Sequence, residues 1–155
     1  MGYTEPDPRE DLSGMDVARK ILILARECGQ SIEADEISLT PLLNEECMNA
    51  ASVEDFYKAL EKDNERFEGL INEAKANDSV LRYIAKLKDG KASIALETVG
   101  KSHAFYSLAG SENIISFTTE RYKENPLVVK GPGAGAEVTA MGVFADIISL
   151  STSRS

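Results

Sequence analysis

Residues 79–99 constrain the fold of this chain more tightly than any other stretch. Polar and apolar side chains alternate, though imperfectly, over 80–87, which is the two-residue period of a β-strand. Lys88-Asp-Gly-Lys91 follows, and an Asp-Gly pair favours a type I′ turn because both of its central positions take positive φ. Ala92 to Val99 reads as the return strand. The sequence therefore predicts a β-hairpin here.

A long helical pattern lies before the hairpin. Apolar residues at helical spacing predict a helix that begins after Asp11 or Ser13, either of which could cap it, and ends at Gly29. Cys28 falls on the apolar face of this helix and is expected to be buried. Gly14 lies in its first turn, where the missing side chain would let another group approach closely.

Two further helices and several extended segments are expected. Ser52-Val-Glu-Asp55 resembles a capping box and opens one helix, and a second helical stretch ends near Asn77. The expected extended segments are a short strand at 35–40, segments at 103–107 and 113–119, and a buried strand at 126–130.

The end of the chain combines a glycine loop with an apolar helix. Gly131-Pro-Gly-Ala-Gly-Ala136 leads into a helical pattern that ends near Leu150. The order of elements predicts an α+β fold, with a mostly antiparallel or mixed sheet and helices on one face. We expect residues 1–130 to form one domain, 131–150 a glycine loop with its helix, and 151–155 a frayed tail.

Charge and composition exclude several classes of partner. The net charge of −9 opposes binding to nucleic acid or to an anionic membrane. No apolar run approaches the ~18 to 20 residues of a membrane span. Cys28 and Cys47 lack the spacing of a metal site or a disulfide framework, which indicates a reduced, cytoplasmic compartment.

The first twenty residues concentrate charge around two prolines. Pro6 and Pro8 bias the residues before them toward extended conformations, so a stiff acidic loop is expected. Asp16 and Lys20 follow four residues apart on the predicted helix. Spacing alone favours an ordinary helix ion pair over a polar site. By the same reasoning, the glycine loop at 131–136 favours tight strand-to-helix packing over ligand contact.

Both ends of the chain carry a family resemblance. Gly2-Tyr-Thr-Glu-Pro-Asp-Pro-Arg-Glu-Asp-Leu-Ser-Gly-Met-Asp-Val-Ala-Arg-Lys20 resembles the signature of homoserine dehydrogenases. Gly131-Pro-Gly-Ala-Gly-Ala-Glu-Val-Thr-Ala-Met-Gly-Val-Phe-Ala-Asp146 resembles the C-terminal glycine loop and helix of the same family. The chain is most similar to the corresponding segment of bifunctional aspartokinase–homoserine dehydrogenases.

The resemblance implies a reaction and a set of site residues. Family members interconvert L-aspartate 4-semialdehyde and L-homoserine with NAD(P), a step toward threonine and methionine. Lys20 matches the catalytic lysine of the family. The remaining matches are the substrate-binding residues Glu5, Asp11 and Asp16, and the cofactor-binding residues Gly2, Glu5 and Gly135; no metal site is implied.

The chain departs from the family in one respect. It contains no strand–glycine-loop–helix unit before Gly2, so we expect it to be the substrate-binding and dimerisation half, without the Rossmann domain that would be its partner in cis. Such a fragment is expected to bind no NAD(P) and to be inactive alone, and to form a homodimer. The alternative is a free-standing amino-acid-binding or dimerisation module with the same fold.

Overall fold

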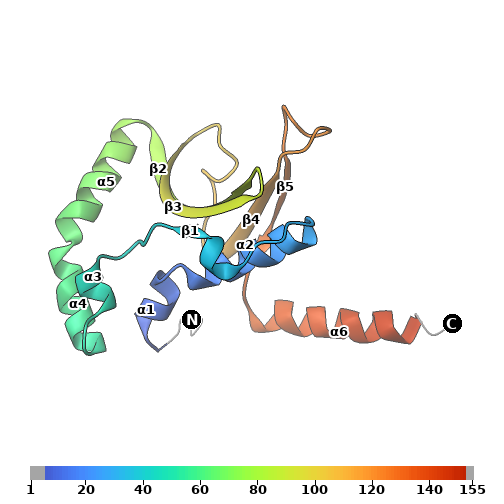
Figure 1. Cartoon of the computed structure of the whole chain (residues 1–155), viewed down its shortest axis with the longest axis horizontal. Helices are drawn as coiled ribbons and strands as arrows, with labels where there is room; N and C mark the ends of the chain where they lie inside the picture. Colours follow the sequence, from blue (N-terminus) through green and yellow to red (C-terminus); the bar gives the residue numbers. More distant parts are fainter. Residues whose placement is uncertain (1–5, 153–155) are drawn as a thin grey trace. The chain divides into compact units, whose positions relative to one another are not determined.

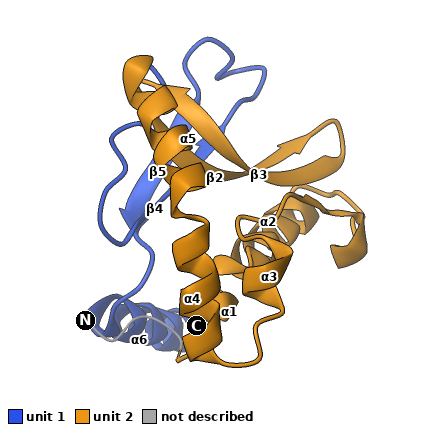
Figure 2. Ribbon diagram, turned by 90° about the vertical axis from the view of Figure 1, so that its left-hand side faces the viewer, with its two compact units in different colours: residues 1–3, 102–155 blue, residues 4–101 orange. Residues whose placement is uncertain are grey.

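The computed structural model describes residues 6–152. The described chain divides into two compact units, which are coloured separately in Figure 2. Residues 6–101 belong to the N-terminal unit and residues 102–152 to the C-terminal unit.

The N-terminal unit holds most of the secondary structure (Figure 1). Its elements, in chain order, are α1 (Pro8–Leu12), α2 (Met15–Glu27), the 3₁₀ turn η1 (Ala34–Glu36), β1 (Ser38–Leu39), α3 (Glu45–Met48), α4 (Val53–Lys62), α5 (Asn64–Ala76), β2 (Ser79–Lys88) and β3 (Lys91–Gly100).

The predicted hairpin is confirmed and forms the centre of this unit. Strands β2 and β3 pair antiparallel along their full length, from Ser79 opposite Gly100 to Lys88 opposite Lys91. Asp89 and Gly90 connect them with φ of 50° and 74°, as a type I′ turn requires. Strand β1 adds parallel to β3, so the sheet is mixed, in the order β1-β3-β2.

Helix α2 covers one face of this sheet. Its inner stripe is Ala18, Ile21 and Ala25, spaced three and four residues apart, and all three are buried. They pack in one cluster with Ala92 and Ile94 of β3. Small residues on both elements let the helix lie close to the sheet. The remaining members of the cluster are Ile32 and the partly buried Val17, Leu22, Ile37, Leu39, Tyr83, Ala85 and Leu87.

A second, smaller core lies among the helices α3 and α4. Cys47 and Phe56 are fully buried there, together with Leu43 and Ala59. The predicted cap of α4 is confirmed, because the Ser52 hydroxyl accepts the backbone N–H of Asp55 at 3.1 Å.

The C-terminal unit contains a two-stranded antiparallel sheet of β4 (Glu112–Phe117) and β5 (Leu127–Pro132), followed by α6 (Ala136–Thr152). No described residue of α6 is buried. Its large apolar side chains are exposed: the exposed fraction is 72% for Met141, 64% for Phe144 and 70% for Leu150. Within its own unit, α6 is thus an apolar helix without a core to pack on.

The segment 35–40, predicted as a strand, is a 3₁₀ turn at Ala34–Glu36 followed by the two-residue strand Ser38–Leu39. Two further predictions for the N-terminal unit were wrong. Pro8–Leu12 forms a short helix, because Pro8 occupies its first turn and the Asp7 carboxylate caps it by accepting the N–H of Arg9 at 2.9 Å. Helix α2 consequently starts only at Met15, after Gly14. Cys28 is exposed, because it lies at the C-cap of α2, beyond the last buried residue of the helix, Ala25.

Two predictions for the C-terminal unit were also wrong. Residues 103–107 form turns, since His103 Nδ1 accepts the N–H of Phe105 and the His103 carbonyl accepts that of Tyr106. These local bonds replace a strand ladder. Residues 127–129 do form a strand, but it is exposed, because among the described residues β5 pairs with β4 alone.

The fold is α+β, as predicted, with helices and small antiparallel and mixed sheets. None of the described helices has both the length and the apolar character that crossing a membrane requires. The two compact units do not test the domain division at residue 130, which stays a prediction.

Gly14, the N-cap of α2, is the position where we expect the largest effect of a single methyl group. Its φ is +80°, and a Cβ would lie 2.7 Å from the Tyr83 hydroxyl. The closeness expected from the sequence is therefore confirmed. Gly14→Ala should cost about 1–2 kcal/mol for the left-handed backbone, and more for the contact with Tyr83. Hydrogen exchange of the α2 amides in urea would measure the loss.

Gly29→Ala is the matched control for this substitution. Gly29 has a similar φ of +78°, but nothing lies within 4 Å of the position of its Cβ. Gly29→Ala should therefore be destabilised only by the cost of placing alanine in the left-handed conformation. Equal destabilisation of the two variants would show that Tyr83 moves aside without cost.

Candidate functional site

The outward face of α2 carries the two residues singled out by their spacing. Lys20 Nζ lies 2.8 Å from Asp16 Oδ2, one helical turn away. Both side chains are open to solvent, with 52% and 64% of their surfaces exposed. Ala18, Ile21 and Ala25 hold the opposite face against the sheet. The packing of α2 therefore forces this ion pair outward, and the carboxylate lies in the first turn, where the helix dipole favours it.

Asp11 lies on the helix before this pair. Helix α1 turns its Arg9 and Leu12 inward, where both are partly buried, while Glu10 and Asp11 are exposed. Leu12 packs against the second core. The three matched residues that the structure describes in this region, Asp11, Asp16 and Lys20, are thus solvent-facing residues of two consecutive helices that contact each other.

Sequence reasoning missed the role of Arg9. It counted this residue as one charge among several, whereas the guanidinium forms a bidentate pair with Asp7 and donates to the Ala50 carbonyl at 2.5 Å. Asp7 is the N-cap of α1. The sequence signal was an aspartate that precedes a proline and an arginine, which suits a capped first turn.

The ion pair with Arg9 shifts the titration of Asp7. Hydrogen bonds from the guanidinium hold the pKa of the Asp7 carboxyl below its usual value. The same bonds raise the pKa of Arg9. The pair therefore remains ionised at neutral pH.

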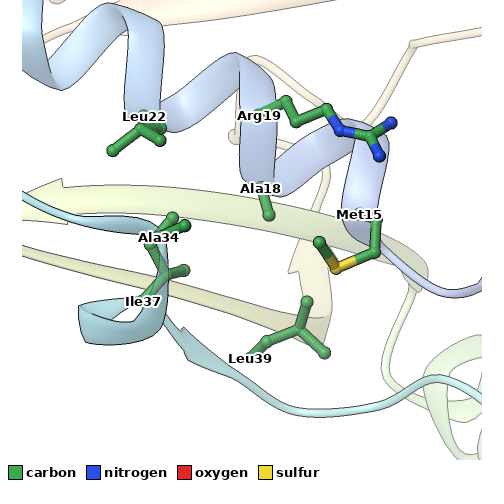
Figure 3. A pocket seen from close by; sticks show the side chains of 7 residues that line it. All are labelled: Met15, Ala18, Arg19, Leu22, Ala34, Ile37 and Leu39. Atoms are coloured by element: carbon green, nitrogen blue, oxygen red, sulfur yellow. The ribbon is translucent and has the colours of Figure 1, made fainter.

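A small apolar pocket lies beside α2 but does not contain the matched residues. Its volume is about 130 Å³, and Ala18 and Leu22 of α2 face Ile37 and Leu39 across it (Figure 3). Arg19 is its single charged lining residue. Asp16 and Lys20 do not line it. This pocket is a gap in apolar packing and offers no group for acid–base chemistry.

The glycine loop lies in the C-terminal unit. Gly135 has φ of +135°, which a side chain would strain, and no atom lies within 4 Å of where a Cβ would be. It immediately precedes α6, and its carbonyl accepts the N–H of Thr139 at 3.0 Å. Its backbone is thus open to the close approach of another group. Gly2 and Glu5, the other residues matched to cofactor binding, lie outside the described residues.

The chemistry open to these residues is that of a cation next to carboxylates. Over residues 6–152, no group of three or more His, Cys, Asp and Glu side chains is placed to hold a metal ion. An ammonium can donate a proton or stabilise an oxyanion, and carboxylates can bind a substrate ammonium group. The side chains of α1 and α2 suit a small zwitterionic substrate.

Comparison with known sequences gives a consistent result. A family model described as homoserine dehydrogenase matches residues 1–148. The chain is 47% identical to a chloroplastic bifunctional aspartokinase/homoserine dehydrogenase 2 of Zea mays, over 97% of this chain and 17% of that protein. It is 43% identical to a homoserine dehydrogenase of Paracoccidioides brasiliensis, over 97% of this chain and 41% of that protein. The chain therefore spans well under half the length of these relatives.

Solved structures agree on the fold. A crystal structure of a protein of unknown function from Candida auris matches 98% of this chain and 43% of its own, with a TM-score of 0.89 and 40% identity. The homoserine dehydrogenase of S. aureus matches 97% of this chain and 34% of its own, with a TM-score of 0.68 and 21% identity. The latter likeness shows a shared fold.

The exposed Asp16–Lys20 pair should contribute little to stability. Lys20→Gln should change the free energy of unfolding by less than about 0.5 kcal/mol, because surface ion pairs are screened by water. Asp63→Asn is the contrasting variant, since Asp63 is only 9% exposed and pairs with Arg66. It should cost about 1 kcal/mol or more. Urea denaturation at neutral pH would measure both changes.

The effect of Asp63→Asn should also depend on pH. Hydrogen bonding to Arg66 lowers the pKa of Asp63, so this carboxylate stabilises the fold above its unfolded pKa of about 3.9. The stabilisation is lost as pH falls through the lower, folded pKa. The gap between wild type and variant should therefore narrow in acid below about pH 4. A gap independent of pH would contradict this assignment.

Proposed function

This chain belongs to the homoserine dehydrogenase family, and we propose that it supplies the substrate-binding half of an NAD(P)-dependent homoserine dehydrogenase. The proposed reaction is the reversible conversion of L-aspartate 4-semialdehyde to L-homoserine, on the way to threonine and methionine. The observation that carries the proposal is the Asp16–Lys20 pair on the outward face of α2, within the matched segment.

We assign Lys20 as the catalytic acid–base residue. In the reducing direction, negative charge develops on the aldehyde oxygen as the carbonyl carbon is reduced. The Lys20 ammonium would stabilise this charge and donate a proton to the oxygen, which yields the hydroxyl of homoserine. In the oxidising direction, the neutral amine would accept the same proton.

We assign carboxylates to the amino-acid end of the substrate. Asp11 on α1 and Asp16 on α2 are exposed, and acidic side chains complement the α-ammonium group that both substrate and product carry. Asp16 also keeps Lys20 in place through their ion pair. We also propose Glu5 as a substrate-binding residue, because its position matches such a residue in the family.

The cofactor proposal rests on the glycine loop. The open backbone of Gly135, at the start of a 17-residue helix, fits a nucleotide that must approach the main chain closely. Gly135 would hold the cofactor together with Gly2 and Glu5. When bound, NAD(P) supplies or accepts the hydride. We propose that the main nucleotide-binding unit lies outside these 155 residues.

The exposed apolar surface of α6 supports a proposal about which residues form which domain. Met141, Phe144 and Leu150 are all more than 60% exposed, although apolar surface of this size is normally buried. We propose that residues 131–150 pack on the nucleotide-binding domain. Residues 1–130 would then form the substrate-binding and dimerisation domain.

We propose that the sheet of the C-terminal unit takes part in a homodimer. The exposed strand β5, in which Val129 is 54% exposed, belongs to a two-stranded sheet whose apolar residues suit such an interface.

We also propose a cytoplasmic location. The two cysteines are free, which is compatible with it. The Zea mays relative carries the word chloroplastic in its name, so a plastid is the alternative compartment.

Lys20→Gln tests the catalytic assignment in the full-length protein. Loss of the proton donor should lower kcat for homoserine oxidation by about 10²–10⁴-fold. Lys58→Gln is a matched control, because Lys58 forms an exposed i,i+4 pair with Glu54 at the same 2.8 Å on α4. It should keep its activity. Unchanged kcat in Lys20→Gln would refute the role of Lys20.

A second experiment tests whether the 155-residue chain needs the rest of the protein for activity. The purified 155-residue chain should show no homoserine oxidation with NAD or NADP, because in this proposal the main nucleotide-binding unit lies outside it. The full-length protein, assayed in parallel, should turn over. Measurable oxidation by the 155-residue chain, free of contaminating enzyme, would contradict the proposal.

A further inference from the structure

Helix α1 is too short to position anything by itself. It contains five residues, and isolated helices of this length do not form in water, because one turn does not repay the cost of nucleation. Its orientation must therefore come from contacts outside the helix. Two inward side chains provide them: Leu12 packs against the Leu43–Cys47–Phe56 core, and Arg9 makes polar contacts.

Arg9 uses all three of its guanidinium nitrogens. Nε donates to Asp7 Oδ1 at 2.9 Å, and Nη2 donates to Asp7 Oδ2 at 2.6 Å. Nη1 donates to the carbonyl of Ala50, which is 41 positions away, between α3 and α4. Its side chain is only 22% exposed, so water competes weakly for these bonds. We call this set of bonds the Arg9 tether.

Polar bonds hold both ends of α1, and the tether is one of the two sets. Asp7 caps the helix by accepting the Arg9 N–H, and the same carboxylate holds the guanidinium that reaches Ala50. At the other end, the Ser13 hydroxyl donates to the Glu10 carbonyl and accepts the Met15 N–H. The position of α1 is thus linked to the first residue of α2.

We propose that Arg9 is a positioning residue, which through the tether between Asp7 and Ala50 holds Asp11 on the outward side of α1 for contact with the amino-acid substrate. This inference rests on the proposed function, since it takes Asp11 as a substrate-binding residue. Arg9 itself faces inward and would not touch the substrate.

The chemistry of the tether requires arginine. A planar guanidinium can make a bidentate bond to one carboxylate and still point a third nitrogen at a carbonyl. A lysine ammonium is a single point charge and cannot satisfy this geometry. If the tether is lost, α1 loses its bond to Ala50 and keeps the packing of Leu12 and the hydrogen bonds of Ser13. Asp11 then samples several positions, which weakens substrate binding without removing the catalytic lysine.

Steady-state kinetics of the full-length protein test the inference. Arg9→Gln should raise KM for homoserine by about tenfold, equivalent to about 1.4 kcal/mol, with kcat and the KM for NAD(P) changed by less than about threefold. Asp7→Asn keeps an oxygen for the helix cap but loses the ion pair, so it should raise KM in the same direction. It also serves as the second variant if Arg9→Gln does not fold.

Arg66→Gln is the matched control for simple destabilisation. Arg66 also pairs with an aspartate of its own segment, Asp63 at 2.8 Å, and donates to a distant carbonyl, that of Leu42 at 3.0 Å. Its loss should lower the melting temperature to a similar extent but leave KM for homoserine unchanged. Loss of folded enzyme lowers the apparent kcat and does not raise KM.

Asp11→Asn distinguishes a failure of the tether inference from a failure of the proposed function. If it raises KM and Arg9→Gln does not, the tether inference is overturned while the proposed function stands. If Asp11→Asn leaves KM unchanged, Arg9 cannot act through Asp11, and the inference is likewise overturned. Absence of homoserine oxidation by the wild-type full-length protein would overturn the proposed function itself. A raised KM in both variants, with Arg66→Gln unchanged, is the expected result.

Discussion

The packing of α2 against the β2–β3 hairpin is the contact on which the rest of the N-terminal unit depends. Three residues of α2 are buried against the sheet residues Ala92 and Ile94; they are Ala18, Ile21 and Ala25. This contact fixes the distance of the helix from the sheet and its rotation about its own axis. A helix has one inner face, so residues offset by about half a turn from that stripe must face outward. Asp16 and Lys20 are therefore exposed because the opposite stripe of α2, formed by Ala18, Ile21 and Ala25, is buried.

A second set of contacts determines where α2 begins. Gly14 adopts φ of +80° directly against Tyr83, whose hydroxyl donates to the Thr40 carbonyl at 2.9 Å. A Cβ at Gly14 would lie 2.7 Å from this hydroxyl, so either the helix or the Tyr83 side chain would have to move. The left-handed glycine also ends α1 and lets the chain change direction. Backbone geometry and close packing thus act at the same residue to place the first turn of α2, which carries Asp16.

The parts of this fold that were predictable from sequence are those whose signals are local. The Asp89-Gly90 turn and the Ser52 cap each depend on residues that are neighbours in sequence, and both are present. Cys28 and the strand predicted at 126–130 were expected to be buried, but burial depends on which elements lie opposite them, and local periodicity does not contain that information. Arg9 was missed for the same reason, since its acceptor on Ala50 lies 41 positions away.

The candidate site shows the same division between local and distant information. The spacing of Asp16 and Lys20 predicts their ion pair, yet an exposed pair in water is worth little and marks no function. Two unit charges about 4 Å apart attract by about 1 kcal/mol in water and by about 4 kcal/mol at an effective dielectric of about 20. The catalytic role proposed for Lys20 would therefore require a part of the protein that covers this face of α2 and excludes water. In that proposal, the fold of the N-terminal unit supplies the position of Lys20, and the covering part would supply the low dielectric in which its charge acts strongly.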